Sequence, residues 1–227
     1  MDIFIKSFNR PFYLERCLRS VFQFITGNFK VTILDDGTPP VYLAKISALF
    51  PDVTIRKSDQ YTEKVSALGA HANKSATFSL TRIPTNLWRT AISESSSVFL
   101  LLEEDAWLTE SIDVDNIETV MKECGLVTVK IGWNGSPLLV EGEKVRLTDS
   151  VEQLIPPTPS VPGIIERVLL TNTFKIRSVL QRLSLVNSLF TLPYYSRYTI
   201  TSAFFDKQYW LWIWENAGDR INEGEQL

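Results

Sequence analysis

Apolar and polar positions in the first half of the chain follow two alternating patterns. Short apolar runs predict buried strands at residues 3–8, 30–34, 53–57 and 98–102. Apolar residues at helical spacing predict helices that begin at Pro11 or cover residues 41–50 and 83–93. Strands that alternate with helices imply right-handed crossovers, so we expect an α/β fold with a mainly parallel sheet. Residues 58–79 show no clear pattern, and no structure is predicted for them.

The second half carries weaker patterns. They predict a strand at residues 126–131, a short ribbon near Arg146, an irregular proline-rich loop at residues 155–163 and helical structure from about residue 174 to 189. A length of 227 residues suits one large α/β domain. We therefore expect a single domain over residues 1–227, with halves at 1–108 and 109–227.

The composition excludes several classes of protein. With 44% hydrophobic and 22% charged residues, the chain can form a substantial core. Its net charge of −3 provides no general basic surface for phosphates, so we expect no nucleic-acid partner. Cys17 and Cys124 lack CxxC spacing and are expected to be buried free thiols. Neither a signal peptide nor an apolar run of membrane-spanning length is recognised, so we expect a cytoplasmic location without a transmembrane segment.

The residues that follow three of the predicted strands are the main candidates for a site. They are Ser7, Phe8, Asn9 and Arg10 after the first strand, Asp35 and Asp36 after the second, and Glu103, Glu104 and Asp105 after the strand at residues 98–102. Ligands of open parallel sheets bind beyond the carboxyl ends of the strands, where we expect these segments to meet. Carboxylates gathered there repel one another unless a cation or a ligand rich in donors lies among them.

Three sequence stretches, taken together, resemble a known family. They are IFIKSFNRPFYLERCLRSV, VTILDDGT and VFLLLEEDAWL, in this order over about residues 3–108. In order and spacing they are similar to the nucleotide-sugar glycosyltransferases of the GT-A fold, especially the family 2-like group. The resemblance implies a three-layer α/β/α Rossmann-like fold in which residues 1–108 bind the nucleotide sugar and residues 109–227 form the acceptor side. It also implies transfer of a sugar, from UDP-sugar in preference, to an acceptor such as a glycan or a lipid-linked molecule.

The resemblance also implies a divalent cation, Mn²⁺ or Mg²⁺, that neutralises the diphosphate as it leaves. Asp105 takes the place of the last aspartate of the family's DxD motif, the usual metal ligand. Glu103 takes the place of the first aspartate, near the ribose or the metal, although glutamate departs from the pattern. If the strand continues, Glu103 and Asp105 face the crevice together while Glu104 faces elsewhere.

The remaining nucleotide contacts are implied in the same way. Asp35 resembles the aspartate that accepts a hydrogen bond from the base, and Asp36 is its less constant neighbour. The backbone around Ser7 to Asn9 flanks the same nucleotide, and Arg10 is counted with these nucleotide-binding residues. Glu104 completes the set.

The acceptor side has its own candidates in residues 201–220, where Tyr209 and three tryptophans crowd into six positions. Aromatic rings stack on sugars, and a neighbouring carboxylate can deprotonate an acceptor hydroxyl. By resemblance Glu215 is the nearest counterpart of the family's catalytic base, and Asp206 is a second candidate. A retaining transferase needs no such base.

Each candidate also has a purely structural interpretation. The Asp35 and Asp36 segment suits an Asx-type turn that caps the next helix. The carboxylates at Glu103 to Asp105 suit a solvated helix N-terminus. The tryptophans suit the core of a last helix. For His71, the only histidine, one open interpretation is a polar loop residue near the donor phosphates, and no motif links it to a catalytic triad.

Two other functions stay open. One is a nucleotide-binding or nucleotide-sugar-binding protein of the same fold without turnover. The other is a sugar-phosphate nucleotidyltransferase, which also uses carboxylate-held Mg²⁺. The absence of GxxxxGK[ST] and GxGxxG sequences argues against P-loop enzymes and ordinary dinucleotide dehydrogenases.

Overall fold

A computed structural model describes residues 1–75, 77, 82–132, 142–155, 163–187, 190–191, 193–194 and 202–219. Contacts divide the chain into two compact units. Unit 1 comprises Met1–Ile131 and Thr201–Arg220, and unit 2 comprises Gly132–Ile200 and Ile221–Leu227. The single domain expected from the sequence stays a prediction. No helix in the described part of the chain is long and apolar enough to cross a membrane.

Unit 1 is built on a six-stranded sheet with the order β4-β3-β1-β5-β10-β7. The strands are β1 (Asp2–Ser7), β3 (Lys30–Asp35), β4 (Thr54–Lys57), β5 (Val98–Glu103), β7 (Thr128–Lys130) and β10 (Ala203–Asp206). Strand β1 pairs in parallel with β3 and β5, and β3 pairs in parallel with β4. Only β10 runs the other way, antiparallel to both β5 and β7. The predicted α/β fold with a mainly parallel sheet is confirmed.

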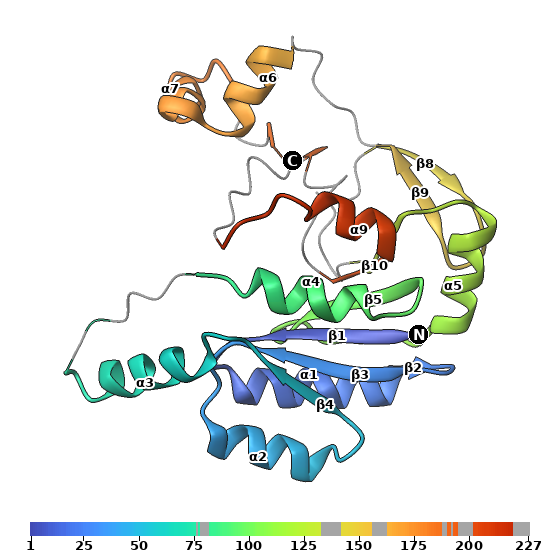
Figure 1. Cartoon of the computed structure of the whole chain (residues 1–227). Helices are drawn as coiled ribbons and strands as arrows, with labels where there is room; N and C mark the ends of the chain where they lie inside the picture. Colours follow the sequence, from blue (N-terminus) through green and yellow to red (C-terminus); the bar gives the residue numbers. More distant parts are fainter. Residues whose placement is uncertain are drawn as a thin grey trace. The chain divides into compact units, whose positions relative to one another are not determined.

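Helices cover both faces of this sheet (Figure 1). Unit 1 contains α1 (Pro11–Phe24), α2 (Pro40–Leu49), α3 (Tyr61–Ala72), α4 (Thr85–Ser93), α5 (Val114–Glu123) and α9 (Lys207–Ile213). Helices α1 and α2 lie on one face, and α4 and α9 lie on the other. The short strands β2 (Ile25–Thr26) and β6 (Ile112–Asp113) pair beside the main sheet. The described helices and sheet of unit 1 thus form the three layers that the resemblance implies.

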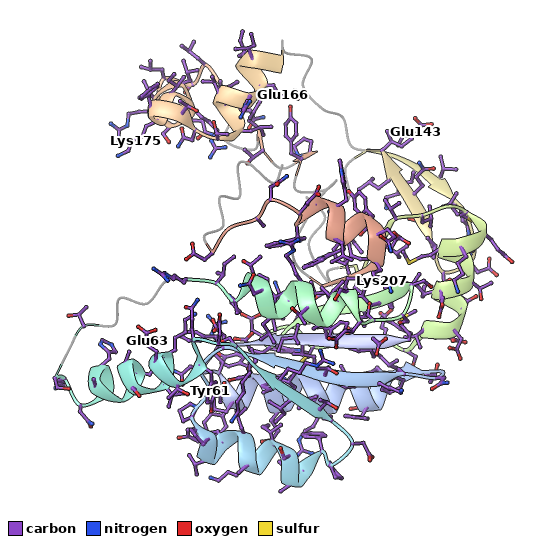
Figure 2. All side chains as sticks on the ribbon, viewed as in Figure 1. Tyr61, Glu63, Glu143, Glu166, Lys175 and Lys207 are labelled. Carbon is purple, nitrogen blue, oxygen red and sulfur yellow. The ribbon has the colours of Figure 1, made fainter. Side chains whose placement is uncertain are left out.

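Helix α3 occupies a region for which the sequence predicts no structure. It begins at Tyr61, which is labelled in Figure 2. The Tyr61 hydroxyl donates to the carbonyl of Thr38 at 2.7 Å. Two side chains of this helix are buried, and one of them is the charged Lys64. A helix whose inner face depends on a lysine lacks the apolar stripe that reveals a helix in sequence.

Apolar side chains of the strands and of α1 fill the core. Ile3, Ile5, Ile33 and Leu100 are fully buried in the sheet. The helices on the two faces of the sheet contribute further buried side chains to this core: Leu14, Cys17, Leu18, Ala91, Ile92 and Trp210. The expectation of two buried thiols is wrong for Cys124, which is exposed at the C-cap of α5, one residue beyond the last residue of that helix.

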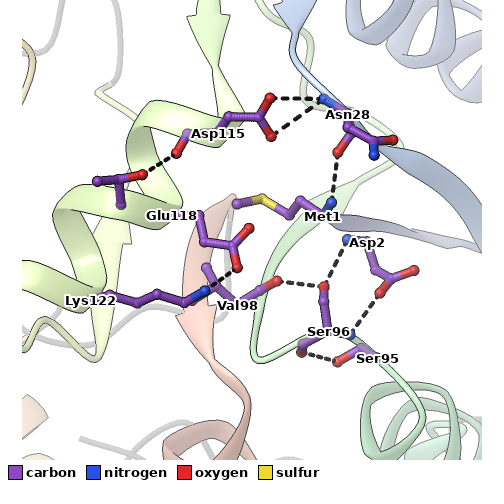
Figure 3. Close-up of polar contacts among 10 residues, drawn as sticks. Met1, Asp2, Asn28, Ser95, Ser96, Val98, Asp115, Glu118 and Lys122 are labelled. Carbon is purple, nitrogen blue, oxygen red and sulfur yellow. Dashed lines mark hydrogen bonds and ion pairs between the residues drawn. The ribbon is translucent and has the colours of Figure 1, made fainter.

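The amino ends of the strands are joined by hydrogen bonds between neutral backbone groups and short side chains (Figure 3). The amide of Asp2 donates to Ser96 Oγ at 3.0 Å, and the amide of Ser96 donates to the Asp2 carboxylate at 2.7 Å. Ser96 Oγ in turn donates to the carbonyl of Val98 at 2.7 Å. On the other side of β1, the Asn28 amide donates to the Asp115 carboxylate at 3.2 Å. This edge of the sheet is therefore closed by local pairing.

Unit 2 contains a hairpin and a helical pair. Strands β8 (Glu143–Arg146) and β9 (Glu152–Ile155) are antiparallel, which confirms the ribbon predicted near Arg146. Helix α6 (Gly163–Leu170) leads through a 3₁₀ turn, η2 (Thr173–Lys175), into α7 (Ile176–Arg182). Their small core contains Leu169, Leu170, Phe190 and Tyr194. The helix predicted to 189 ends earlier, and most of the proline-rich loop predicted at 155–163 lies outside the described residues.

Candidate functional site

The strand register brings the three candidate segments to one edge of the sheet. At the carboxyl end of β1, Ser7 lies opposite Asp35 of β3. On the other side of β1, Lys6 lies opposite Glu103 of β5. The residues that follow these three strands therefore share the crevice position of an open parallel sheet.

The three carboxylates at the end of β5 are paired with cationic side chains of β1 and of the turn that follows it. Lys6 Nζ donates to Glu103 Oε1 at 2.8 Å. Arg10 Nη1 donates to Asp105 Oδ2 at 2.5 Å, and Arg10 Nε lies 4.0 Å from Glu104 Oε1. The alternation expected from a continuing strand is wrong, because β5 ends at Glu103 and the next two residues form a turn. The helix N-terminus interpretation is also wrong, since the next helix, α5, begins only at Val114.

Glu104 is the buried member of this carboxylate group, with 8% of its surface exposed. Burial raises its pKa to about 6, and the negative charge of Asp105 adds to the rise. Its backbone amide, which donates to the Lys6 carbonyl at 3.0 Å, holds the turn against β1. Burial, with the charges of Glu104 and Asp105, likewise raises the pKa of the nearby Cys17 thiol to about 12.

This edge of the sheet, as far as the structure describes it, can offer a divalent cation only one or two carboxylate ligands from the protein. Carboxylate oxygens are the donors that Mg²⁺ and Mn²⁺ prefer, and Mg²⁺ sites often combine one or two carboxylates with substrate phosphates. The described residues contain no group of three or more metal-ligating side chains. Asp105 is exposed and fits such a site, provided that Arg10 releases it. Glu103, held by Lys6, is a second donor of the right type.

Asp35 lies at the same edge and has no exposed surface. Its Oδ1 accepts hydrogen bonds from the backbone amides of Gly37 at 3.1 Å and Thr38 at 2.9 Å. Its Oδ2 is buried and has no hydrogen-bond partner among the described residues. The Asx-type turn is therefore present, but it does not cap α2, whose N-cap is Pro39 without a side-chain hydrogen bond.

Asp36 is committed to a buried ion pair that the sequence does not reveal. Lys64 Nζ of α3 donates to Asp36 Oδ2 and also to the Arg82 carbonyl. Ser58 Oγ donates to Asp36 Oδ1 at 2.6 Å. Burial raises the pKa of Asp36, although Lys64 and Ser58 oppose the rise. Lys64 is the site-edge residue that sequence reasoning missed, because only tertiary structure pairs α3 with the end of β3.

The turn that follows β1 packs against the turn that follows β3. The Asn9 amide donates to Thr38 Oγ1 at 3.0 Å, with Asn9 in a left-handed conformation at φ 53°. Phe8 lies so close to Gly37 that a Cβ there would come within 2.9 Å of its ring. Gly37 also has φ 151°, so both space and backbone conformation favour glycine. Phe8, Asn9 and the Asp35 turn thus form one packed surface.

A line of contacts links the carboxylate edge to the segment that carries Glu215. Lys6 Nζ, bound to Glu103, also lies 5.0 Å from the centre of the Trp88 ring. The Trp88 ring meets the Trp214 ring edge to face at 5.6 Å. Glu215 directly follows Trp214, so the structure brings this candidate to the side of the sheet where α4 begins.

Asp206 lies elsewhere. It pairs with Val98, the first residue of β5, whereas Glu103 is the last residue of that strand. Its carboxylate accepts from the Tyr209 amide at 2.9 Å and caps α9. The structure therefore does not bring Asp206 together with the carboxylates after β5. His71 is also apart, exposed in the last turn of α3 and not in a loop.

An open groove of about 630 Å³ runs between α4 and α9. Its lining residues are Asn86, Arg89, Thr90 and Ser93 on one side and Gln208, Leu211, Trp212 and Glu215 on the other. Trp212 is 70% exposed, whereas Trp210 and Trp214 are buried in the core. The core interpretation is therefore right for two tryptophans, and the third provides an exposed aromatic face beside Glu215.

No protein-family model matches the chain, and no curated protein matches it. Similar solved structures include Staphylococcus aureus TarS with UDP-GlcNAc, at 12% identity and TM-score 0.45, over 76% of this chain and 47% of TarS. A Pyrobaculum calidifontis mannosyltransferase with GDP-Man and Mn²⁺ has 10% identity and TM-score 0.42, over 99% and 50%. Mycobacterium tuberculosis glucosyl-3-phosphoglycerate synthase with UDP has 11% identity and TM-score 0.41, over 91% and 56%. The chain spans about half the length of each, and these structures are GT-A glycosyltransferases, the group that the sequence motifs resemble.

Proposed function

We propose that the protein is a glycosyltransferase that transfers a sugar from a nucleoside-diphosphate sugar, with UDP-sugar favoured, to an acceptor hydroxyl. The observation that carries the proposal is the meeting of Asp35 and the Glu103 to Asp105 carboxylates at one edge of a parallel sheet. Such an edge suits a ligand that offers both hydrogen-bond donors and a metal-bound diphosphate.

Asp35 is proposed to recognise the base. Its Oδ2 is buried without a hydrogen-bond partner among the described residues, a state that costs free energy unless a donor arrives. An N–H of a pyrimidine or purine base would supply that donor. Because Asp35 has no exposed surface, the groups that cover its carboxylate must move as the base enters.

The diphosphate is proposed to bind beside Asp105 and Arg10. When bound, Mn²⁺ or Mg²⁺ would supply Lewis-acid neutralisation of the departing phosphate charge. Asp105 would hold the ion, with Glu103 as a second donor. Arg10, released from Asp105, would then lie near the phosphate oxygens, where a guanidinium forms strong charge-assisted hydrogen bonds.

The acceptor is proposed to lie along the groove between α4 and α9. Trp212 exposes an aromatic face there, on which a sugar ring can stack. In an inverting reaction, Glu215 would accept the proton of the acceptor hydroxyl. The acceptor oxygen would bond to the anomeric carbon as the bond from that carbon to the diphosphate breaks.

Calorimetric titration of the protein with UDP and with GDP, each with and without Mn²⁺, tests the donor site. We expect one nucleotide to bind more tightly when Mn²⁺ is present. If neither nucleotide binds under either condition, the assignment of this edge as a donor site is wrong.

The acceptor side is tested separately with the Glu215→Gln variant. We expect nucleotide affinity to stay at the wild-type value while release of UDP from a UDP-sugar, with acceptors present, falls by about 10²-fold or more. Glu123→Gln, an exposed glutamate at the end of α5, is the matched control and should leave turnover unchanged. Wild-type turnover in Glu215→Gln would remove this residue from the proposal.

One observation favours a second function, that of a nucleotide-binding or nucleotide-sugar-binding protein without turnover. Glu103 and Asp105 are both already paired with cationic side chains. If those pairs persist, the protein binds the nucleotide without a metal and has no means to neutralise the leaving group. Nucleotide binding that is insensitive to Mn²⁺, together with no donor hydrolysis or transfer across a panel of acceptors, would favour this function.

A further inference from the structure

The helical pair of unit 2 exposes an unusual number of apolar side chains. Phe174 is 91% exposed, Ile164 83% and Leu185 70%. Four others on the same segment are also exposed: Ile165, Ile176, Val179 and Leu183. We call these seven residues the α6–α7 apolar surface.

The exposed side chains of this surface are not the ones that pack the two helices against each other. The small core of the pair uses Leu169, Leu170, Phe190 and Tyr194, with Leu180 and Val186 packed against it. None of the seven belongs to that cluster. Exposed apolar residues that gather on one short segment, rather than scattering singly, are typical of a surface that binds something.

The spacing of the exposed residues gives α7 one continuous apolar stripe. Ile176, Val179 and Leu183 follow the i, i+3, i+7 pattern of a single helix face. The turn before α7 holds Asn172, Phe174 and Lys175 in left-handed conformations, which non-glycine residues rarely adopt. That turn presents Phe174 almost fully to solvent.

The charge of the segment is opposite to that of the chain. Residues 163–187 contain four cations, Arg167, Lys175, Arg177 and Arg182, against the single carboxylate of Glu166, a net charge of +3. The whole chain has a net charge of −3. Glu166 is also engaged, because it accepts a hydrogen bond from the Tyr194 hydroxyl at 2.6 Å. Figure 2 labels Lys175 and Glu166 on this helical pair.

We propose that the α6–α7 apolar surface docks the protein on an anionic lipid surface. Short helices with exposed apolar side chains and interspersed Lys and Arg lie in the plane of a bilayer interface, with their apolar side chains among the acyl chains and their cations at the headgroups. Each cation near an anionic surface adds to the attraction. The inference rests on unit 2 alone and does not depend on the proposed glycosyltransferase function.

Sedimentation of the full-length protein with phosphatidylcholine vesicles, with and without phosphatidylglycerol, tests the proposal. We expect binding to the anionic vesicles, weaker binding to the neutral ones, and a decline as salt is added. If the wild-type protein does not sediment with anionic vesicles at low salt, the proposal is wrong.

Two variants separate the apolar and charged contributions. The triple variant Ile164→Ser, Phe174→Ser, Leu185→Ser should lower partitioning by at least about tenfold, because three apolar side chains leave the interface. The double variant Lys175→Glu, Arg182→Glu should lower it by about tenfold or more on anionic vesicles only. Phe12→Ser with Val41→Ser, which changes exposed apolar residues of unit 1, is the matched control and should bind as wild type.

The same variants distinguish a second copy of the chain as the occupant. If the wild-type protein is a dimer, the triple variant is a monomer, and vesicle binding is equal in both, the surface is a dimer interface and the lipid proposal is overturned. Near-ultraviolet circular dichroism checks that the triple variant folds. Should it not fold, the double charge variant decides, since its two changes lie outside the small core; unchanged binding to anionic vesicles would then overturn the proposal.

Discussion

At the two ends of the parallel sheet in unit 1, the carboxylates have different kinds of partner. At the amino end, the carboxylates of Asp2 and Asp115 accept hydrogen bonds from backbone amides (Figure 3). At the carboxyl end, Asp36, Glu103 and Asp105 instead meet the cationic side chains of Lys64, Lys6 and Arg10. Backbone amides are fixed by the fold, whereas a lysine or an arginine can exchange one anion for another. The amino end is thus closed by the fold, while the carboxyl end is equipped to accept a charged ligand.

Burial of carboxylates at the carboxyl end adds to the difference between the two ends of the sheet. Asp35 Oδ2 has no hydrogen-bond partner among the described residues, and burial raises the pKa values of Asp36 and Glu104. Strained or incompletely paired polar groups tend to cluster where a protein binds or reacts. Variants at the amino end should therefore change stability alone, whereas changes in ligand binding should come from variants at the carboxyl end.

The largest expected effect is on stability, at the buried pair of the carboxyl end. Lys64→Met should lower the free energy of unfolding by about 3–5 kcal/mol, because it leaves Asp36 buried without its counter-charge. The loss should shrink on acidification, since protonated Asp36 needs no cation. Urea denaturation measures it.

Lys122→Met is the matched control for Lys64→Met. It breaks an exposed i,i+4 pair with Glu118 on α5, which should contribute less than about 0.5 kcal/mol. Equal losses in the two variants would mean that burial does not distinguish the two pairs.

The next effect is on ligand binding. Asp105→Asn should abolish the enhancement of nucleotide affinity by Mn²⁺, a loss of about 100-fold in the presence of metal, while metal-free affinity stays unchanged. Titration calorimetry with and without Mn²⁺ measures both values. Asp115→Asn at the amino end is the control, and it should keep the full enhancement. A metal response that survives in Asp105→Asn would contradict the metal assignment.

The third prediction concerns pH and Glu104. Its folded-state pKa of about 6 lies above the ordinary value of 4.5, so the unfolded chain releases this proton first as pH rises. The free energy of unfolding therefore falls as the pH rises between these two values. Above about pH 7, ionised Glu104 should lower it by about 1–2 kcal/mol.

Glu104→Gln removes that cost. The variant should be more stable than wild type above about pH 7 and show no such gain below the ordinary pKa of glutamate. Unfolding free energies from urea titrations at both pH values give the comparison. A gain that is the same at both values would point to packing and not to ionisation.

Sequence patterns predicted the central strands β1, β3 and β5 well because these strands are largely buried, but they did not predict β10. The apolar runs of β1, β3 and β5 follow directly from that burial, and so does the edge at which their carboxyl ends meet. The polar pairings at the edge were not predictable. Lys64 reaches Asp36 from another helix, and strand alternation stops at Glu103 because a turn begins there.

Helical spacing would also have predicted which tryptophans of the aromatic segment are buried and which is exposed. In a helix, Trp210 and Trp214 are four residues apart and share a face, whereas Trp212 points away from them. The structure buries the first two and exposes the third accordingly. The role of Asp206 as the N-cap of α9 was likewise accessible, since aspartate before a helical run is a common cap.

The smallest expected effect lies at the amino end. Ser96→Ala removes an oxygen that accepts from the Asp2 amide and donates to the Val98 carbonyl, so it should lower the free energy of unfolding by about 1 kcal/mol. Nucleotide affinity, with and without Mn²⁺, should stay at the wild-type value, because these bonds lie at the opposite end of β5 from Glu103. Denaturation and titration of the same sample measure both quantities. A change in affinity as large as the change in stability would mean that the two ends of the sheet are coupled, and that amino-end bonds also position the ligand edge.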